Sequence, residues 1–423
     1  MFMTVALPVI VIFAIMMVFG VPIYIVMLTA TIYLQVFVNH MPLQNMFNGM
    51  FEALTKNSLL AIPFFVLAGN LMATGSLGTR LVEFVNVFLK KMPGGFAISC
   101  VGANAIFGAI SGSAPAATGT FGKILWKPLR EVYGDREAAG LITSSASLSP
   151  IIPPAMTMII FGLITETSVA KLFIAGLMPG ILLVIIMAVY LFMKYRKSVA
   201  DVTRQPGERR AAIKQGVPAL LLPVIILGGI YGGICSPTEA GAIAATYSFV
   251  VSIFIIRDIK IRQLPSIVIS SAKTVGTVFI LMASSNVFSQ ALTITQAPQA
   301  LQASMSGLTP FTYLVLLNIL LLILGCFIDP AGAMLIVVPL LAPIGIALGI
   351  DILHMGAIFA VNMAIGMFTP PFGLSLFVAS DVLEKPISFI ARGCVPYVFC
   401  YLIGLIFVTY IPEISLFLPR LLS

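Results

Sequence analysis

Charged side chains are scarce in this sequence. Of its 423 residues, 9% are Asp, Glu, Lys or Arg and 60% are hydrophobic, whereas a soluble domain carries about 25% charged residues. This shortage excludes a water-soluble globular protein. The apolar residues gather in long runs, such as 176–193 and 311–328, and runs of about 20 apolar residues indicate membrane helices. The composition therefore predicts an all-α polytopic membrane protein.

The residues that most enzymes need are also rare. The two histidines are not part of an HExxH motif, which argues against a zinc protease. An aspartyl mechanism needs paired carboxylates, and Asp329 has no evident partner. Gly122-Lys123 is not a phosphate-binding loop, because Ala117 and Ile124 stand where that motif requires Gly and Ser or Thr. The five cysteines lie singly, without a CxxC pair, and indicate packed thiols. We therefore do not expect this protein to be an enzyme.

The sequence repeats itself at an offset of 215 to 217 residues. Residues 7–22 match residues 222–237, and the pair Pro153-Pro154 falls on Pro370-Pro371. Because the offset is nearly constant along the chain, the matches predict two homologous halves joined through residues 194–216.

The number of membrane crossings decides how the halves are related. Residues 4–38 are apolar apart from a Gly-Val-Pro break at 20–22. At about 1.5 Å per residue they are too long for one span of a ~30 Å hydrocarbon core, so we expect two spans there. With further spans near 56–74, 138–165 and 169–193, the first half crosses an odd number of times. The two repeats are therefore predicted to have inverted topology.

The distribution of Lys and Arg supports the inverted arrangement. It places 20 of the 23 basic residues in cytoplasmic loops, as the positive-inside rule requires, whereas a parallel arrangement places 15 there. The net charge of +8 then reflects retained cytoplasmic loops and not nucleic-acid binding. We expect both termini to be periplasmic, 194–216 to be a basic cytoplasmic linker, and 77–91 and 257–273 to be interfacial helices.

Two segments are too rich in Gly, Ser and Pro for ordinary membrane helices. Residues 94–122 start and finish among basic residues and turn at Ser111–Pro115, so we expect a re-entrant helical hairpin that enters from the cytoplasm. Its counterpart, 311–347, turns at 326–334 and has flanks without Lys or Arg, which predicts entry from the periplasm. Irregular backbone at this depth is tolerated only where it lines a cavity, because unsatisfied backbone groups are costly in lipid.

Each half also contains a broken helix, about 138–165 and about 354–380. The breaks centre on the proline pairs, which free carbonyl groups and expose half-helix ends. Carbonyls and helix C-termini suit a cation, and helix N-termini suit an anion. A single motif of this kind is commonly only a packing device. Four at repeat-related positions favour a site for a coupled ion and a substrate.

These patterns divide the chain into alternating scaffold and transport segments. The predicted segments are 1–75, scaffold spans and arm of the first repeat; 76–165, its transport elements; 166–193, its last span; 194–216, the linker; 217–290, scaffold spans and arm of the second repeat; 291–380, its transport elements; and 381–423, the last span and the C-terminal tail.

At "GAISGSAPAATGTFGK" (108–123), "SPIIPPAM" (149–156) and "TPPFGLSLF" (369–377), the chain resembles the large membrane subunit of tripartite ATP-independent periplasmic (TRAP) transporters, over essentially its whole length. The resemblance implies an elevator mechanism in the bacterial inner membrane, coupled to Na⁺. It also implies a small four-span membrane subunit and a periplasmic binding protein that delivers an organic acid anion. Family substrates are mostly C4-dicarboxylates and sialic acids, and overall similarity favours a sialic acid system.

The resemblance further implies that sodium binds where the hairpin tips face the broken helices. The residues carried over are Ser111, Gly112, Ser113, Ser147 and Ser149 for one site, and Asp329, Gly332, Gly366 and Thr369 for the other. Ser149 and Thr369 have the alternative of bonding to their own helices. An ionisable residue deep in a membrane, such as Asp329, is by default functional, and the first tip has no matching carboxylate, so we do not expect equivalent sites.

The substrate carboxylate is expected at half-helix N-termini in both halves. The predicted contacts are Pro115, Ala116, Thr118, Pro154, Pro371, Phe372 and Gly373. An alternative is a stand-alone sodium–carboxylate symporter of related architecture that needs no binding protein. A channel is disfavoured because no span carries a polar stripe along its length.

Overall fold

The computed structural model describes residues 2–196, 208–304 and 307–422. These residues form helices and loops, with no strand in the described ranges. Eight helical segments among them are long and apolar enough to cross a membrane. The prediction of an all-α polytopic membrane protein is therefore confirmed.

The first half contains ten α-helices and two short segments of other helix types. Their bounds are α1 (Phe2–Val18), α2 (Ile23–Tyr33) with the π-helical η1 (Leu34–Val38), α3 (Gln44–Leu54), the 3₁₀ turn η2 (Asn57–Leu60), α4 (Ala61–Thr74), α5 (Leu77–Leu89), α6 (Gly95–Ser111), α7 (Ala114–Tyr133), α8 (Asp135–Ala146), α9 (Met156–Thr165) and α10 (Val169–Lys194).

The second half follows a similar order, with no described helix in the place of α3 and with an additional helix, α20, at the C-terminal end. Its helices are α11 (Glu208–Tyr231), α12 (Pro237–Val250) with the π-helical η3 (Val251–Ile255), the 3₁₀ turn η4 (Ile261–Gln263), α13 (Leu264–Ile294), α14 (Ala297–Ser304), α15 (Pro310–Phe327), α16 (Pro330–Ala347), α17 (Ile352–Met367), α18 (Leu374–Leu383), α19 (Ile387–Tyr410) and the C-terminal α20 (Glu413–Leu422).

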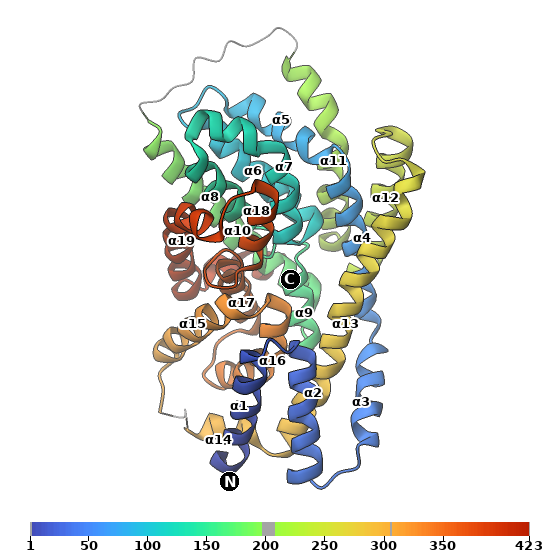
Figure 1. Ribbon diagram of the computed structural model, residues 1–423, viewed down its shortest axis with the longest axis vertical. Helices are drawn as coiled ribbons and strands as arrows, with labels where there is room; N and C mark the ends of the chain where they lie inside the picture. Colours follow the sequence, from blue (N-terminus) through green and yellow to red (C-terminus); the bar gives the residue numbers. More distant parts are fainter. Residues whose placement is uncertain (1, 197–207, 305–306, 423) are drawn as a thin grey trace.

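Each half thus holds a helical hairpin followed by an interrupted helix. The hairpins are α6–α7 and α15–α16, and the interrupted helices are α8/α9 and α17/α18, with a cis proline pair in each interruption. The amphipathic helices α5 and α14 precede the hairpins and lie at opposite ends of the long axis in Figure 1. The inverted relation of the two halves remains a prediction.

Two boundaries differ from the sequence expectations. The predicted interfacial segment 257–273 is not a separate helix, because α13 runs unbroken from Leu264 to Ile294. Pro265 occupies its first turn, where a helix tolerates proline, and no later proline interrupts it. The predicted linker is shortened because α11 begins at Glu208, while residues 197–207 lie outside the described residues.

Helices α1–α4 and α11–α13, which we call the scaffold group, pack side by side along the length of the molecule (Figure 1). Helix α4 packs against α12 and α13. The Asn70 amide donates a hydrogen bond of 2.8 Å to the Ser271 hydroxyl, which joins α4 to α13. A polar bond between two apolar helices fixes their register, because neither group has water as an alternative partner.

The hairpins and interrupted helices, together with α10 and α19, form a second set that we call the hairpin group. Its packing is crossed between repeats: α7 contacts α18, and α16 contacts α9. A Cβ atom at Gly140 would lie 2.1 Å from the Gly393 carbonyl oxygen, so α8 and α19 touch through their backbones. These contacts tie the two halves into one compact unit.

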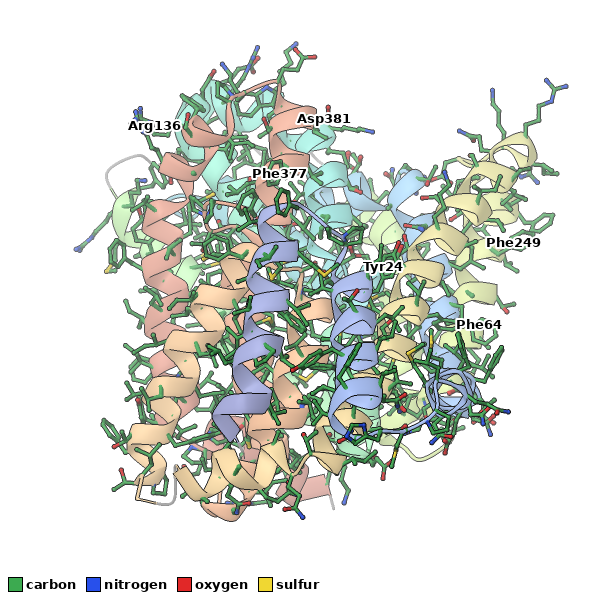
Figure 2. All side chains as sticks on the ribbon, turned by 60° about the horizontal axis from the view of Figure 1, so that its bottom comes forward. Tyr24, Phe64, Arg136, Phe249, Phe377 and Asp381 are labelled. Carbon is green, nitrogen blue, oxygen red and sulfur yellow. The ribbon has the colours of Figure 1, made fainter. Side chains whose placement is uncertain are left out.

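The surface has the polarity of a membrane protein. Arg136 and Asp381 lie together at one end, whereas Phe64 and Phe249 lie on the side formed by α4 and α12 (Figure 2). Outward-facing aromatic residues such as Phe399 remain 62% exposed. An apolar belt with charges at its ends suits a lipid bilayer.

Candidate ion and substrate site

The tip of the first hairpin is built from three small residues. Gly112 adopts a left-handed conformation with φ of +59°, which glycine enters without steric cost, and its N–H bonds to the Gly108 carbonyl at 2.9 Å. Ser113 then caps α7 by accepting from the Ala116 N–H at 3.5 Å, and Pro115 lies in the first turn. Cap and proline start the new helix immediately after the turn.

This tip is held between the first break and the scaffold. A Cβ atom on Gly108 would lie 2.8 Å from the Ser149 Cα, and one on Gly69 of α4 would lie 2.8 Å from the Ser111 Cα. The backbone therefore approaches its neighbours on both sides as closely as glycine permits. Small residues at these positions are required by packing as well as by chain reversal.

The second tip uses a carboxylate where the first uses a hydroxyl. Asp329 caps α16 by accepting from the Gly332 N–H at 3.0 Å. The second break is bonded to this tip, because the Phe372 N–H donates to the Cys326 carbonyl at 3.0 Å. Gly366 packs on the hairpin below the tip, in the position that Ser149 occupies in the first half.

The two tips face a common cavity of about 460 Å³. The first residues of four helices line it: Ala114 of α7, Met156 of α9, Pro330 of α16 and Leu374 of α18. Helix N-termini carry partial positive charge and unpaired N–H groups, so together they favour an anion. Both hairpins and both interruptions thus converge at one place.

Asp329 is the one formally charged residue among the described residues that line this cavity. Its carboxylate is half-buried and gives the cavity a negative group beside the positive helix ends. The opposite wall is α13 of the scaffold group, whose Thr274 and Thr277 hydroxyls add polar atoms. The cavity therefore offers both a cation ligand and anion donors.

Some predicted site residues lie at the cavity and others behind it. Gly112, Ser113, Pro115 and Asp329 line it. The lining residues not predicted from the sequence include Pro150, Met156, Thr157, Thr274, Thr277, Val278 and Leu281. The lining residues of α13 belong to an uninterrupted helix and have no nearby Gly-Pro motif that would mark them as part of a site. The one local indication was a pair of threonines, Thr274 and Thr277, one turn apart on the helix.

The serines of the first break differ in how their hydroxyls are used. Ser147 donates to the Thr143 carbonyl at 3.2 Å. The Ser149 hydroxyl is fully buried and has no hydrogen-bond partner among the described residues. A buried polar group without a partner is costly, and a bound cation would satisfy the oxygen of Ser149.

For the other residues predicted to bind sodium or substrate, those roles remain predictions. Thr369 donates to the Ile365 carbonyl at 2.6 Å, the back-bonding alternative, and Thr118 is buried and donates to the Ala114 carbonyl. The Pro154 carbonyl lies beside Gly112. Ala116 lines a second cavity. Pro371, Phe372 and Gly373 form the second break without lining the tip cavity.

The resemblance implies sodium-dependent uptake with Ser149 as a ligand, and on that expectation we predict that Ser149→Ala raises the sodium concentration for half-maximal uptake by about tenfold. This factor corresponds to one lost ligand interaction of about 1.4 kcal/mol. The melting temperature should stay the same or rise, because the substitution removes an unpaired buried hydroxyl. The control is Ser144→Ala, whose hydroxyl already bonds to the Gly140 carbonyl at 2.7 Å. Equal sodium dependence in both variants would contradict a ligand role for Ser149.

The fold and the cavity define a class: a polytopic α-helical membrane protein with two helical hairpins and two interrupted helices around one cavity. Among solved structures, the Alcanivorax borkumensis YdaH transporter shares this fold with a TM-score of 0.59 and 14% sequence identity, covering 89% of this chain and 88% of that one. At this identity the likeness concerns the fold alone.

The family follows from sequence comparison. The model of the "Tripartite ATP-independent periplasmic transporter, DctM component" matches residues 10–414, and the chain belongs to this family of TRAP transporter large permeases. The Pseudomonas aeruginosa C4-dicarboxylate TRAP transporter large permease protein DctM is 40% identical over 384 residues, covering 88% of this chain and 89% of that protein. The resemblance stated from the motifs is confirmed, as is the expectation of a transport protein and not an enzyme.

Other relatives carry different substrates in their names. The Haemophilus influenzae sialic acid TRAP transporter permease protein SiaT is 34% identical, covering 86% of this chain and 60% of that protein. Ectoine and isethionate permeases are also related. The family membership therefore leaves the substrate of this chain open.

Proposed function

We propose that this chain is the transport subunit of a bacterial inner-membrane TRAP transporter that imports an organic acid anion together with sodium ions. The anion would bind at the four helix N-termini of the tip cavity, and sodium would bind behind the tips and beside Asp329. Two or three sodium ions would offset the anionic load, and each net positive charge moved inward gains about 2.3 kcal/mol per 100 mV.

The observation that carries this proposal is the meeting of four helix N-termini and one carboxylate in a single cavity. Positive helix ends alone would suit an anion, and a carboxylate would repel it. A cation placed between them resolves the conflict, because it neutralises Asp329 and leaves the N–H groups for the substrate. Binding of the anion would then depend on prior binding of sodium.

The division into two helix groups supports an elevator movement of the hairpin group. This group is cross-packed between the two repeats through close glycine contacts. It meets the scaffold group where α6 packs on α4 and α16 packs on α13, and the tip cavity lies on this border. A tightly cross-packed group is suited to move as one rigid body against its neighbour. Both termini would be periplasmic, as the Lys and Arg distribution predicts.

Family membership supports two partners, a small four-span membrane subunit and a periplasmic substrate-binding protein. The outward apolar faces of the scaffold group suit a membrane subunit or lipid, with exposed residues such as Val224, Ile243 and Phe249. The C4-dicarboxylate class is the first substrate to test, because the relative at 40% identity carries that name. Sialic acid remains the second, with SiaT at 34%.

The test is uptake by proteoliposomes that contain the chain and its small subunit, with the binding protein outside. Radiolabelled succinate, N-acetylneuraminate and isethionate are offered in turn. We expect one of them to accumulate under an inward sodium gradient, and a tenfold gradient to support about tenfold accumulation per coupled ion. Uptake that survives replacement of sodium by choline on both sides would contradict the proposal.

The same vesicles separate the stand-alone symporter from the tripartite system. Omitting the binding protein should reduce the initial rate of uptake to the background of empty liposomes. An unchanged rate without it would favour a symporter that takes its substrate directly from solution.

A further inference from the structure

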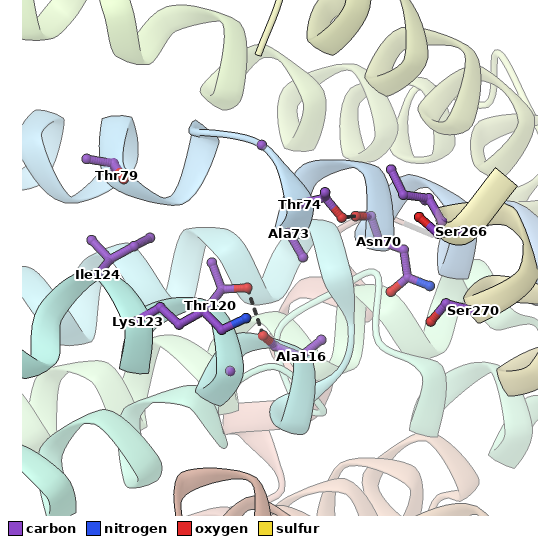
Figure 3. Close-up of a pocket in the computed structure, with 13 residues that line it drawn as sticks. Asn70, Ala73, Thr74, Thr79, Ala116, Thr120, Lys123, Ile124, Ser266 and Ser270 are labelled. Atoms are coloured by element: carbon purple, nitrogen blue, oxygen red, sulfur yellow. Dashed lines mark hydrogen bonds between the residues drawn. The ribbon is translucent and has the colours of Figure 1, made fainter. Parts of the chain in front are cut away.

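Gly122-Lys123, which is not a phosphate loop, occupies a defined place in the fold. Gly122 lies where α7 packs on α18, and a Cβ atom there would lie 2.8 Å from a methyl carbon of Val382. Lys123 follows on a different face of the helix and lines a cavity of about 580 Å³ (Figure 3). The lysine thus stands at a gap between the hairpin group and the scaffold group.

This second cavity is polar and its lining is formally positive. Lys123 is the one charged residue among the described lining residues, and it makes no ion pair or hydrogen bond with any described residue. Figure 3 shows its side chain reaching toward Thr120 and Ala116. The neutral polar residues of the lining are Asn70, Thr74, Thr79, Thr120, Ser266 and Ser270.

The two cavities follow one another along the same pair of helices. Pro115 of α7 lines the tip cavity, whereas Ala116, Gly119 and Thr120 line the second. On α13, Thr274 lines the tip cavity and Ser270 lines the second. Lys123 lies nine residues from the start of α7, which is about 13 Å along the axis. The second cavity therefore continues the first toward the end where the basic loops are predicted to be cytoplasmic.

We propose that the second cavity is an anion-binding station on the cytoplasmic release path, with Lys123 as its cation. A carboxylate or sulfonate group that leaves the helix N-termini of the tip cavity meets a described lining in which Lys123 is the one charged residue. The Asp258 carboxylate beside Gly75 is engaged by Ser76, whose N–H and hydroxyl donate to it. The surrounding hydroxyl and amide groups of α4, α7 and α13 hydrogen-bond the rest of the solute. This inference rests on the proposed transport of an organic anion.

The charge preference of the cavity can be measured without transport. Ser270→Cys places a thiol on the α13 wall with little change of size, in a background where the partly exposed Cys235 and Cys326 are replaced by Ser. The complete transporter in phosphatidylcholine liposomes is labelled from the cytoplasmic side with anionic sulfonatoethyl and cationic trimethylammonioethyl methanethiosulfonate. Their rate ratio reports the local potential.

We expect Lys123→Gln to lower the anionic-to-cationic rate ratio about fourfold at low salt, and Lys123→Arg to retain it, since a unit charge closer than about one Debye length changes each rate about twofold in water. Lys127→Gln is the control, because Lys127 lies one turn further along α7 and outside the lining. Equal effects of Lys123→Gln and Lys127→Gln would overturn the proposal, because the potential would then come from the general surface charge.

Protection identifies the kind of anion. Millimolar succinate, isethionate or N-acetylneuraminate on the cytoplasmic side should slow labelling of the Lys123 protein and not of the Gln variant. If added phosphatidylglycerol slowed the labelling and these solutes did not, the cavity would be a site for lipid headgroups, and the proposed role in release would be wrong. Charge selectivity and protection without sodium-coupled uptake would overturn the proposed function and leave an anion site at Lys123 without a role in release. Uptake without charge selectivity would overturn this inference alone.

Discussion

Replacing Asp329 with Asn is expected to reduce sodium-driven uptake about 100-fold while leaving the fold intact. Asn caps a helix about as well as Asp, so the Gly332 N–H keeps an acceptor and the charge alone is lost. In the proposed site Asp329 pairs with a sodium ion. Removing one partner of a desolvated charge pair costs about 3 kcal/mol, and 1.4 kcal/mol corresponds to a factor of ten. The measurement is the initial rate of uptake at a fixed sodium gradient.

A matched control exists on the next helix. Asp351 caps α17 by accepting from the Leu353 N–H at 2.8 Å, and it lies in an exposed loop. Asp351→Asn makes the same chemical change on the same kind of cap, away from the tip cavity. It should leave uptake near the unsubstituted rate. A loss of similar size in both variants would show that the cap matters and that the charge at Asp329 does not.

A large structural effect at the site is expected from Gly366→Ala, where the second hairpin touches α17. A Cβ atom at this position would lie 2.4 Å from the Gly325 carbonyl oxygen, and the obstacle is backbone, which cannot rotate away. Overpacking of this kind costs about 1–3 kcal/mol, and the second hairpin must separate from α17 to accommodate it. We expect a melting temperature lower by about 5 °C in detergent and uptake lower by at least about tenfold.

Gly276→Ala is the control for this effect. Gly276 lies in the middle of α13, and a Cβ atom there would meet no heavy atom within 4 Å. Alanine is the better helix former by about 1 kcal/mol, so this variant should melt at the same temperature or slightly higher. If Gly366→Ala were as stable and as active as Gly276→Ala, the close contact between hairpin and broken helix would not be required.

The elements with local chemical signals were the ones that the sequence could predict. The turn at Gly112 and the interruptions at the two proline pairs lie where expected, because glycine and proline act on the backbone of their own segment. The tip residues Ser113 and Asp329 reach the cavity for the same reason. Each of them is the N-cap of the helix that follows its turn, so the position of the turn also fixes the position of its side chain at the cavity.

What the sequence could not show depends on contacts between distant segments. The pairing of Gly108 with Ser149, and the position of Thr274 and Thr277 opposite the tips, follow from how helices pack in three dimensions. No periodicity in an almost uniformly apolar chain reports which face of α13 meets the hairpins. The amphipathic helix Gln44–Leu54 was not anticipated, because its 11 residues lie between two strongly apolar spans.

The central claim is that both hairpin tips border one site that sodium and substrate share. Ser113→Cys and Ala331→Cys place one thiol on each tip at the cavity lining, again with Cys235 and Cys326 replaced by Ser. Labelling by a small water-soluble thiol reagent is followed in proteoliposomes with and without sodium and succinate, or whichever anion the uptake assay identifies. The account predicts that sodium slows labelling of both thiols, and that sodium with the anion slows both further. Protection of one tip alone, or of neither, would contradict it.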